Sequence, residues 1–233
     1  VNTFISALLF RLGNVKKNIG YNREGRGFLL DFSPEINYHK HYINRYAFLF
    51  NEYIGNKYVY LPELSLRHTG QKTFQFDNSH KTIALYLGGE NKEFRKYPDE
   101  YAVQLLRLLN RQGYNLLLIG DENDNIKHTQ YAEEARIDHL INLTARTTIE
   151  GFINTIANVD LIITIDSSAL HIAAAVKTPF IALMGLSTSP TSTILPKVPL
   201  GRILKIENNL IREEDYIRNI TPDLILKTIS ELI

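Results

Sequence analysis

A short polar segment interrupts one strongly apolar stretch of the sequence. The run 161–165 is typical of a strand buried on both faces, and the alanine-rich run 169–176 is typical of a tightly packed helix. The polar residues at their junction are Asp166, Ser167, Ser168 and His171. Unpaired helix amides and the helix dipole attract anions at such a junction, so phosphate binding is one chemistry that these residues predict.

A purely structural interpretation fits the same residues. Serine is a preferred N-cap residue because its hydroxyl accepts a backbone N–H, so Ser167 predicts a helix start without any ligand. His171 would then be an ordinary first-turn histidine. Both interpretations stay open on these residues alone.

Two other predicted strands also end in glycine and polar residues. The residues that follow them are Gly88, Gly89, Glu90 and Asn91 after the first, and Gly120, Asp121 and Glu122 after the second. Parallel strands present their carboxyl ends along one edge of a sheet, so the three strand ends should form one rim.

This rim predicts a nucleotide site. Glycines let a backbone approach a ligand, Glu122 can accept hydrogen bonds from ribose hydroxyls, and Lys92, Arg95 and Lys96 can neutralise phosphates. Each feature also has an ordinary explanation, because glycines commonly end strands and basic residues before a helix are commonly exposed.

Other chemistries fit less well. The chain has no Gly-x-Gly-x-x-Gly after a strand, no Gly-x4-Gly-Lys-Ser/Thr and no Gly-x-Ser-x-Gly, which disfavours a standard dinucleotide fold, a P-loop and a serine hydrolase. Asp166 and His171 are five residues apart, which is not a standard metal-ligand spacing, so no metal site is expected.

The elements that position the rim alternate between strands and helices from about residue 79 to the end. Predicted strands cover 82–87, 115–119, 140–143, 161–165 and 180–184. Predicted helices cover 98–112, 126–136, 147–158 with a Thr147-x-x-Glu150 capping box, 169–176, and a last one starting at Thr221. This alternation predicts an α/β fold with a doubly wound parallel sheet over 79–233.

Residues 1–78 contain too few elements for a second complete domain of this type. The predicted elements are helices at 2–12 and 39–54 and short strands at 17–21 and 58–61, followed by a connection over 64–81. We therefore expect the trailing part of an incomplete α/β domain. The first residue is Val1, and we expect the natural protein to begin further upstream.

The composition is that of a globular protein, with 44% apolar and 22% charged residues among 233 and a net charge of +1. Nothing in this balance demands nucleic acid as a partner. Cysteine is absent, which excludes disulfides and thiolate chemistry. Neither a membrane-spanning segment nor a signal peptide is evident, so a cytoplasmic location is expected.

Several segments resemble the heptosyltransferase-type family 9 glycosyltransferases. Residues 166–185 resemble the family's Asp-Ser/Thr-Gly-Pro-Met-His-Leu-Ala-Ala-Ala motif and the Gly-Thr-Pro and Leu-Phe-Gly segments that follow it. Residues 93–98 are similar to its Lys-Arg-Trp-Pro segment, and residues 142–149 to its Asn-Leu-Ala-Gly-Lys-Thr-Ser-Leu segment. Residues 6–9, 19–21 and 23–27 are also similar to family members.

The resemblance implies a GT-B fold, in which two Rossmann-like domains face each other across a cleft and the carboxyl-terminal one holds a nucleotide-sugar donor. It implies metal-independent, inverting sugar transfer, with a heptose from ADP-heptose passing to lipopolysaccharide or a related cell-envelope glycan. No cofactor beyond the donor is implied. A lipid-linked acceptor would place the enzyme at the inner face of the membrane, with peripheral contact.

The resemblance also implies roles for individual residues. Arg95 and His171 would stabilise the leaving group, with Lys96 as the alternative to Arg95. The other donor-binding residues would be Gly89, Glu90, Asn91, Gly120, Glu122, Asp166, Ser167 and Ser168.

The chain departs from the family pattern at three points. Ser168 replaces the usual glycine, and residues 186–190 form only a loose version of the Pro-Thr-x-Pro loop. The family's general base, an aspartate near the amino terminus, is expected to precede Val1. These departures keep a second hypothesis open, that of a noncatalytic nucleotide- or glycan-binding module or a degenerate transferase.

Overall fold

The computed structural model shows two compact units, which are described separately. The described residues are 3–38, 41–59, 65–77, 79–185, 195–196, 198–206 and 212–233, without the side chains of 42, 43, 90, 91, 93, 213 and 214. The first unit comprises Val1–Glu63 with Ser189–Leu195, and the second comprises Leu64–Thr188 with Pro196–Ile233.

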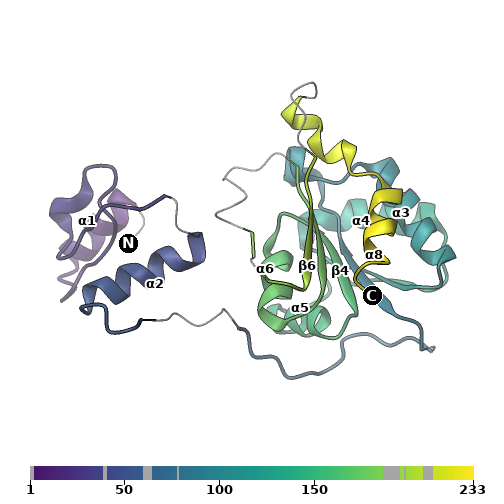
Figure 1. Ribbon diagram of the computed structural model, residues 1–233, viewed down its shortest axis with the longest axis horizontal. Coiled ribbons are helices and arrows are strands. Elements are labelled where there is room, and N and C mark those ends of the chain that lie inside the picture. The colour runs from purple at the N-terminus through teal and green to yellow at the C-terminus, as the bar shows by residue number, and fades with distance from the viewer. Residues whose placement is uncertain are drawn as a thin grey trace. The chain divides into compact units, whose positions relative to one another are not determined.

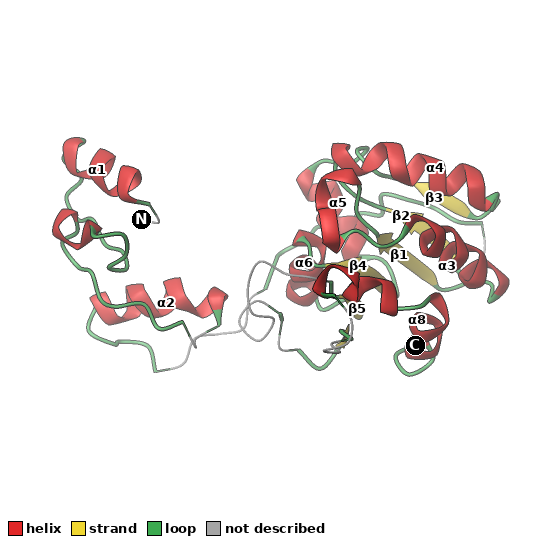
Figure 2. Ribbon diagram, turned by 90° about the horizontal axis from the view of Figure 1, so that it is seen from above, coloured by secondary structure: helices red, strands yellow, loops and turns green. Residues whose placement is uncertain are grey.

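A six-stranded parallel sheet with the order β3-β2-β1-β4-β5-β6 forms the centre of the second unit (Figure 2). The strands are β1 (Thr82–Tyr86), β2 (Asn115–Leu118), β3 (Leu140–Asn142), β4 (Leu161–Ile165), β5 (Phe180–Leu183) and β6 (Gly201–Leu204). All residues of β1, β2, β4 and β5 are buried, as the continuous apolar runs predict.

Helices cover both faces of this sheet. The α-helices are α3 (Asp99–Arg111), α4 (Asn125–Ala135), α5 (Ile149–Ala157), α6 (Ser168–Val176) and α8 (Pro222–Ile229). Short 3-10 helices are η2 (Glu90–Arg95), η3 (Glu122–Asp124) and η4 (Glu213–Asn219). Figure 1 shows α5 and α6 on one side of the sheet and α3, α4 and α8 on the other. The predicted doubly wound α/β fold is confirmed.

The structure of this unit differs from the sequence prediction in two places. The N-cap of α5 is Thr148, whose hydroxyl accepts from the amide of Gly151, so the capping box predicted at Thr147 is wrong by one residue. Strand β6 was not predicted, because only four residues form it and its two middle residues are exposed at the sheet edge. A Cβ on Gly201 would lie 2.1 Å from the Phe180 ring, so β6 pairs with β5 at a position where only glycine fits.

The segment before β1 belongs to the second unit. The amide of Leu66 donates to the carbonyl of Ala175, and the side chain of Asn154 both donates to and accepts from Thr69. These bonds hold residues 65–77 against α5 and α6, whereas the sequence analysis placed the domain boundary after residue 78.

The first unit contains α1 (Phe4–Leu12), η1 (Arg26–Leu29) and α2 (Tyr42–Tyr53). Both predicted helices are confirmed, and Ile5, Leu9 and Leu12 on α1 are exposed. The strand predicted at 17–21 is wrong, because only a single bridge between Ile19 and Phe32 forms there.

The other strand predicted in the first unit covers 58–61. Residues 58–59 are not in a strand, and residues 60–61 lie outside the described residues. Among the described residues, no helix combines the length and apolar character that crossing a bilayer requires.

Candidate functional site

The carboxyl ends of β1, β2 and β4 lie side by side. Tyr86 is in register with Thr164, and Leu85 is in register with Leu118. From β1 the chain proceeds to β2 and β3 on one side, and β4 to β6 lie on the other, so the strand order reverses between β1 and β4. Ligands of open α/β sheets bind at this kind of switch point. The predicted rim therefore exists.

The rim is closely packed where β1 ends. Gly88 has a φ of +81°, and a Cβ there would lie 2.6 Å from the Ile165 side chain at the end of β4. The helix η2 then crosses the rim, because the Phe94 carbonyl would lie 2.5 Å from a Cβ on Gly185, which follows β5. One short helix thus reaches from the end of β1 to the end of β5, two strands away.

The end of β1 packs directly against the turn that follows β2. A Cβ on Gly89 would lie 2.3 Å from the carbonyl oxygen of Asn123, and one on Gly120 would lie 2.7 Å from Oδ2 of Asp124. Both glycines are required for this packing, whether or not a ligand binds. The side chain of Glu122 is exposed above them.

A cation, a carboxylate and a phenol meet at the same place. Lys92 Nζ lies 3.2 Å from Asp121 Oδ2 and 5.7 Å from the centre of the Tyr86 ring. Burial raises the pKa of the Tyr86 hydroxyl, and the negative charges of Asp124 and Asp121 raise it further. The hydroxyl therefore stays protonated. Burial would raise the pKa of Asp121, but hydrogen bonds from Asn123 and Lys92 outweigh it and lower that pKa. Lys92 is thus paired with protein and is not a free phosphate ligand.

The start of α6 follows the sequence prediction, and the capping interpretation of Ser167 is correct. Its Oγ accepts from the amide of Ala169 at 3.2 Å and lies 3.0 Å from Thr164 Oγ1. Thr164 Oγ1 in turn donates to the carbonyl of Ile165, so the Ser167 proton is used for the bond to Thr164. Asp166 and His171 are half-buried and Ser168 is exposed.

The two basic candidates on the rim differ sharply. Among the described residues, Arg95 has no hydrogen-bond or ion-pair partner, and its side chain is half-buried. Lys96 Nζ instead lies 2.8 Å from Oδ1 of Asp99, and Lys127 lies 3.1 Å from the other oxygen of that carboxylate. Burial opposes ionisation of Asp99, but hydrogen bonds from Lys96, Tyr131 and Lys127 lower its pKa to about 2. The structure therefore favours Arg95 over Lys96 as a phosphate ligand.

Glu90 and Asn91 lie in η2, and their side chains are outside the described set. Within the described residues, no group of three or more histidine, aspartate or glutamate side chains could hold a metal ion.

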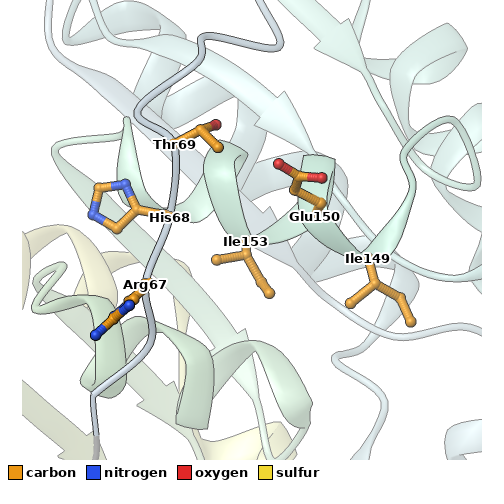
Figure 3. Close-up of a pocket in the computed structure, with 6 residues that line it drawn as sticks. All are labelled: Arg67, His68, Thr69, Ile149, Glu150 and Ile153. Atoms are coloured by element: carbon orange, nitrogen blue, oxygen red, sulfur yellow. The ribbon is translucent and has the colours of Figure 1, made fainter.

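Cavities also lie away from these strand ends on the second unit. One of about 480 Å³ lies between α5 and the segment before β1, and Arg67, His68, Thr69, Ile149, Glu150 and Ile153 line it (Figure 3). Another of about 380 Å³ lies beside Lys96 and the start of α3. The paired charges Arg212–Asp215 and Arg218–Glu100 are among its lining.

Sequence reasoning missed two buried polar residues beneath the end of β2, Asp124 and His128. Both have zero exposure, and His128 Nδ1 lies 2.8 Å from Thr144 Oγ1. Their spacing of four residues, which places them on one helix face, is the only signal in the sequence that could have drawn attention to them.

Comparison with known proteins gives consistent matches. The family model for glycosyltransferase family 9 (heptosyltransferase) matches residues 1–214. Lipooligosaccharide heptosyltransferase 2 of Haemophilus influenzae is 31% identical over 163 residues, which cover 65% of this chain and 47% of that protein. The chain thus spans about half the length of this relative.

Solved structures share the fold. The E. coli ADP-heptose lps heptosyltransferase II superposes with a TM-score of 0.81 at 22% identity, covering 100% of this chain and 74% of that one. E. coli heptosyltransferase WaaC with ADP has a TM-score of 0.73 at 16% identity, covering 99% and 70%. At these identities the two superpositions establish a shared GT-B-type fold.

Proposed function

Because the chain belongs to glycosyltransferase family 9, we propose that the intact protein transfers a sugar from a nucleotide-linked donor to a cell-envelope glycan. The proposed donor is ADP-heptose, and the proposed acceptor is lipid-linked lipopolysaccharide or a related glycan. The related E. coli structures named with ADP-heptose or ADP support this choice of donor. The reaction needs no cofactor beyond the donor, and it would take place at the inner face of the membrane.

The observation that carries the proposal is the rim at the switch point. The guanidinium of Arg95, which has no partner among the described residues, lies on the helix that crosses the rim, and the amino end of α6 lies at the neighbouring strand end. Helix amides and a guanidinium are both suited to a diphosphate. Glu122, exposed at the end of β2, stands where an acidic residue accepts ribose hydroxyls in dinucleotide-binding sheets.

The same groups account for the chemistry. When the bond between the sugar and the diphosphate breaks, negative charge builds on the departing phosphate. Arg95, the amides of α6 and His171 on its first turn stabilise that charge more strongly than they stabilise the ground state, which lowers the barrier. Inversion at the sugar carbon follows if the acceptor hydroxyl attacks from the opposite side.

Calorimetric titration with ADP, UDP and inorganic pyrophosphate tests this proposal. We expect ADP to bind more tightly than pyrophosphate, because the nucleoside adds contacts at the end of β2. Absence of binding of any nucleoside diphosphate at millimolar concentration would contradict the proposal.

Ser168 favours one alternative, a nucleotide- or glycan-binding module without transferase activity. Its exposed side chain stands at the first position of α6, where the family pattern has glycine. A sugar-transfer assay on the intact protein separates the two functions. The binding module would bind ADP but would transfer no sugar from a nucleotide-linked donor to an acceptor. Ser168→Gly would then be expected to tighten donor binding.

A further inference from the structure

Asp124 and His128 form a buried polar pair that the proposed reaction does not use directly. Asp124 ends η3 and precedes α4, and His128 lies one helical turn further on, so both side chains share one face. Both residues have zero exposure. Among the described residues, Asp124 Oδ1 and His128 Nε2 are buried atoms without a hydrogen-bond partner. Buried polar atoms of this kind are rare and call for an explanation.

Asp124 holds the turn that carries Glu122. Its Oδ2 accepts from the amide of Asp121 at 2.9 Å, and Asp121 in turn accepts from the amide of Asn123 at 2.8 Å. The same oxygen is the atom that a Cβ on Gly120 would strike. The conformation of residues 120–123 therefore depends on where this carboxylate sits.

His128 reaches the same turn by a second route. Its Nδ1 lies 2.8 Å from Thr144 Oγ1, and the amide of the next residue, Ala145, donates to the carbonyl of Gly120 at 3.1 Å. Ala145 has a φ of +60°, an uncommon conformation for alanine that this connection maintains. The turn is thus fixed from α4 and from the connection between β3 and α5.

The protonation state of His128 decides how the pair interacts. Burial lowers its pKa to about 4, against the opposing charges of Asp124 and Asp121, so the ring is neutral near neutral pH. A neutral ring has one N–H. If Thr144 donates to Nδ1, the ring proton is on Nε2, and a buried water can bridge this N–H to Asp124 Oδ1, which has no direct partner among the described residues.

We propose that Asp124 and His128 are positioning residues for the nucleoside end of the donor. In this pair the Nε2–H of His128 reaches Asp124 Oδ1 through one buried water, since neither atom has a direct partner among the described residues, and this link keeps Asp124 bonded to the amide of Asp121. The pair thereby sets the position of Glu122. This inference rests on the proposed binding of a nucleotide donor.

Calorimetry with two ligands tests the pair. Asp124→Asn and His128→Asn should weaken ADP binding about tenfold and leave pyrophosphate binding within about twofold, because only the nucleoside contact shifts. His128→Gln places a nitrogen near the Nε2 position and should restore ADP binding. The control Tyr131→Phe removes a buried hydroxyl on the same helix that bonds Asp99, and it should not change the ratio of ADP to pyrophosphate affinity. The inference would be overturned if the variants lost ADP and pyrophosphate affinity equally. It would also be overturned if Tyr131→Phe changed the ratio of the two affinities as much as they do.

Nuclear magnetic resonance of the ligand-free protein gives a second, independent readout. The imidazole nitrogen shifts should identify the Nε2–H tautomer of His128, and amide exchange at Asp121 and Asn123 should accelerate about tenfold in His128→Asn. An Nδ1–H tautomer or unchanged exchange would refute the pair. If the unsubstituted protein bound no ADP, the proposed function would fail, and these two measurements would still decide whether the pair fixes the turn.

Discussion

Lys92 Nζ lies 3.2 Å from the carboxylate of Asp121 and joins the ends of two neighbouring strands. The two residues are 29 positions apart in sequence, and the contact exists because β1 and β2 pair in parallel. The ammonium group also lies over the Tyr86 ring. This contact leads to the first prediction.

Lys92→Met should raise the pKa of Asp121, because the substitution removes a cation that lowers it. Since the folded pKa of Asp121 is below its ordinary value, the pair stabilises the fold above that ordinary value. The contribution is lost as pH falls through the folded pKa. Asp121 is about half exposed, so we expect a loss below about 1 kcal/mol at neutral pH. A carboxyl resonance titration and urea unfolding measure the two effects. Lys16→Met, at an exposed lysine of the first unit, should change neither.

Arg95→Ala should weaken ADP binding about tenfold or more, because a charge-assisted contact to phosphate is lost. Lys96→Ala is the matched comparison, since it removes a neighbouring cation that is bonded to Asp99. We expect Lys96→Ala to change nucleotide affinity less than about twofold, with its main effect on stability. Calorimetry on the two variants shows whether Arg95 or Lys96 binds the phosphate. A larger loss of ADP affinity in Lys96→Ala than in Arg95→Ala would contradict the assignment of Arg95.

Gly89→Ala should destabilise the second unit by about 2–3 kcal/mol, because its Cβ would enter the space of the Asn123 backbone. Gly151→Ala is the control, since a Cβ there would make only ordinary contacts, the shortest being 3.4 Å to Thr147 and to Thr148. This helical position should gain roughly 0.5–1 kcal/mol from the substitution. Urea unfolding gives both values, and equal stability of the two variants would contradict the close packing of the strand ends.

The stability of the protein should fall as pH decreases from about 6.5 to about 4 because of His128. Its folded pKa is lowered by burial, so the unfolded chain binds more protons than the folded chain within this window. The slope from this one group should reach up to about 1.4 kcal/mol per pH unit. The negative charges of Asp124 and Asp121 oppose this lowering of the His128 pKa. The ring centre of Tyr131 lies 5.9 Å from that of His128.

Urea unfolding between neutral pH and pH 5 compares this slope in the unsubstituted protein and in His128→Gln, which cannot titrate there. The remaining histidines are the same in both proteins, so the difference isolates His128. Parallel slopes would mean that His128 is not buried in its neutral form.

The sequence alone was sufficient for the class of fold and for most elements of the second unit. The strand Leu161–Ile165 is buried on both faces, so nearly all of its residues are apolar. Such a strand can be recognised from its local sequence alone. Helix starts were also predictable, because caps such as Ser167 and Thr221 act within a few residues of themselves. The first unit was less predictable, since its short apolar segments do not distinguish a strand from a loop.

Only the tertiary structure decided which polar groups meet. Arg95 and Lys96 are adjacent and chemically similar, yet one is unpaired among the described residues and the other is bonded to Asp99. Asp124 and His128 do not stand out in the sequence. Only their contacts with Gly120 and Thr144 in the structure show that they lie beneath the rim. The physical reason is that propensity and capping act over a few residues. Charge pairing and burial depend instead on strand order, which brings together residues that are far apart in the chain.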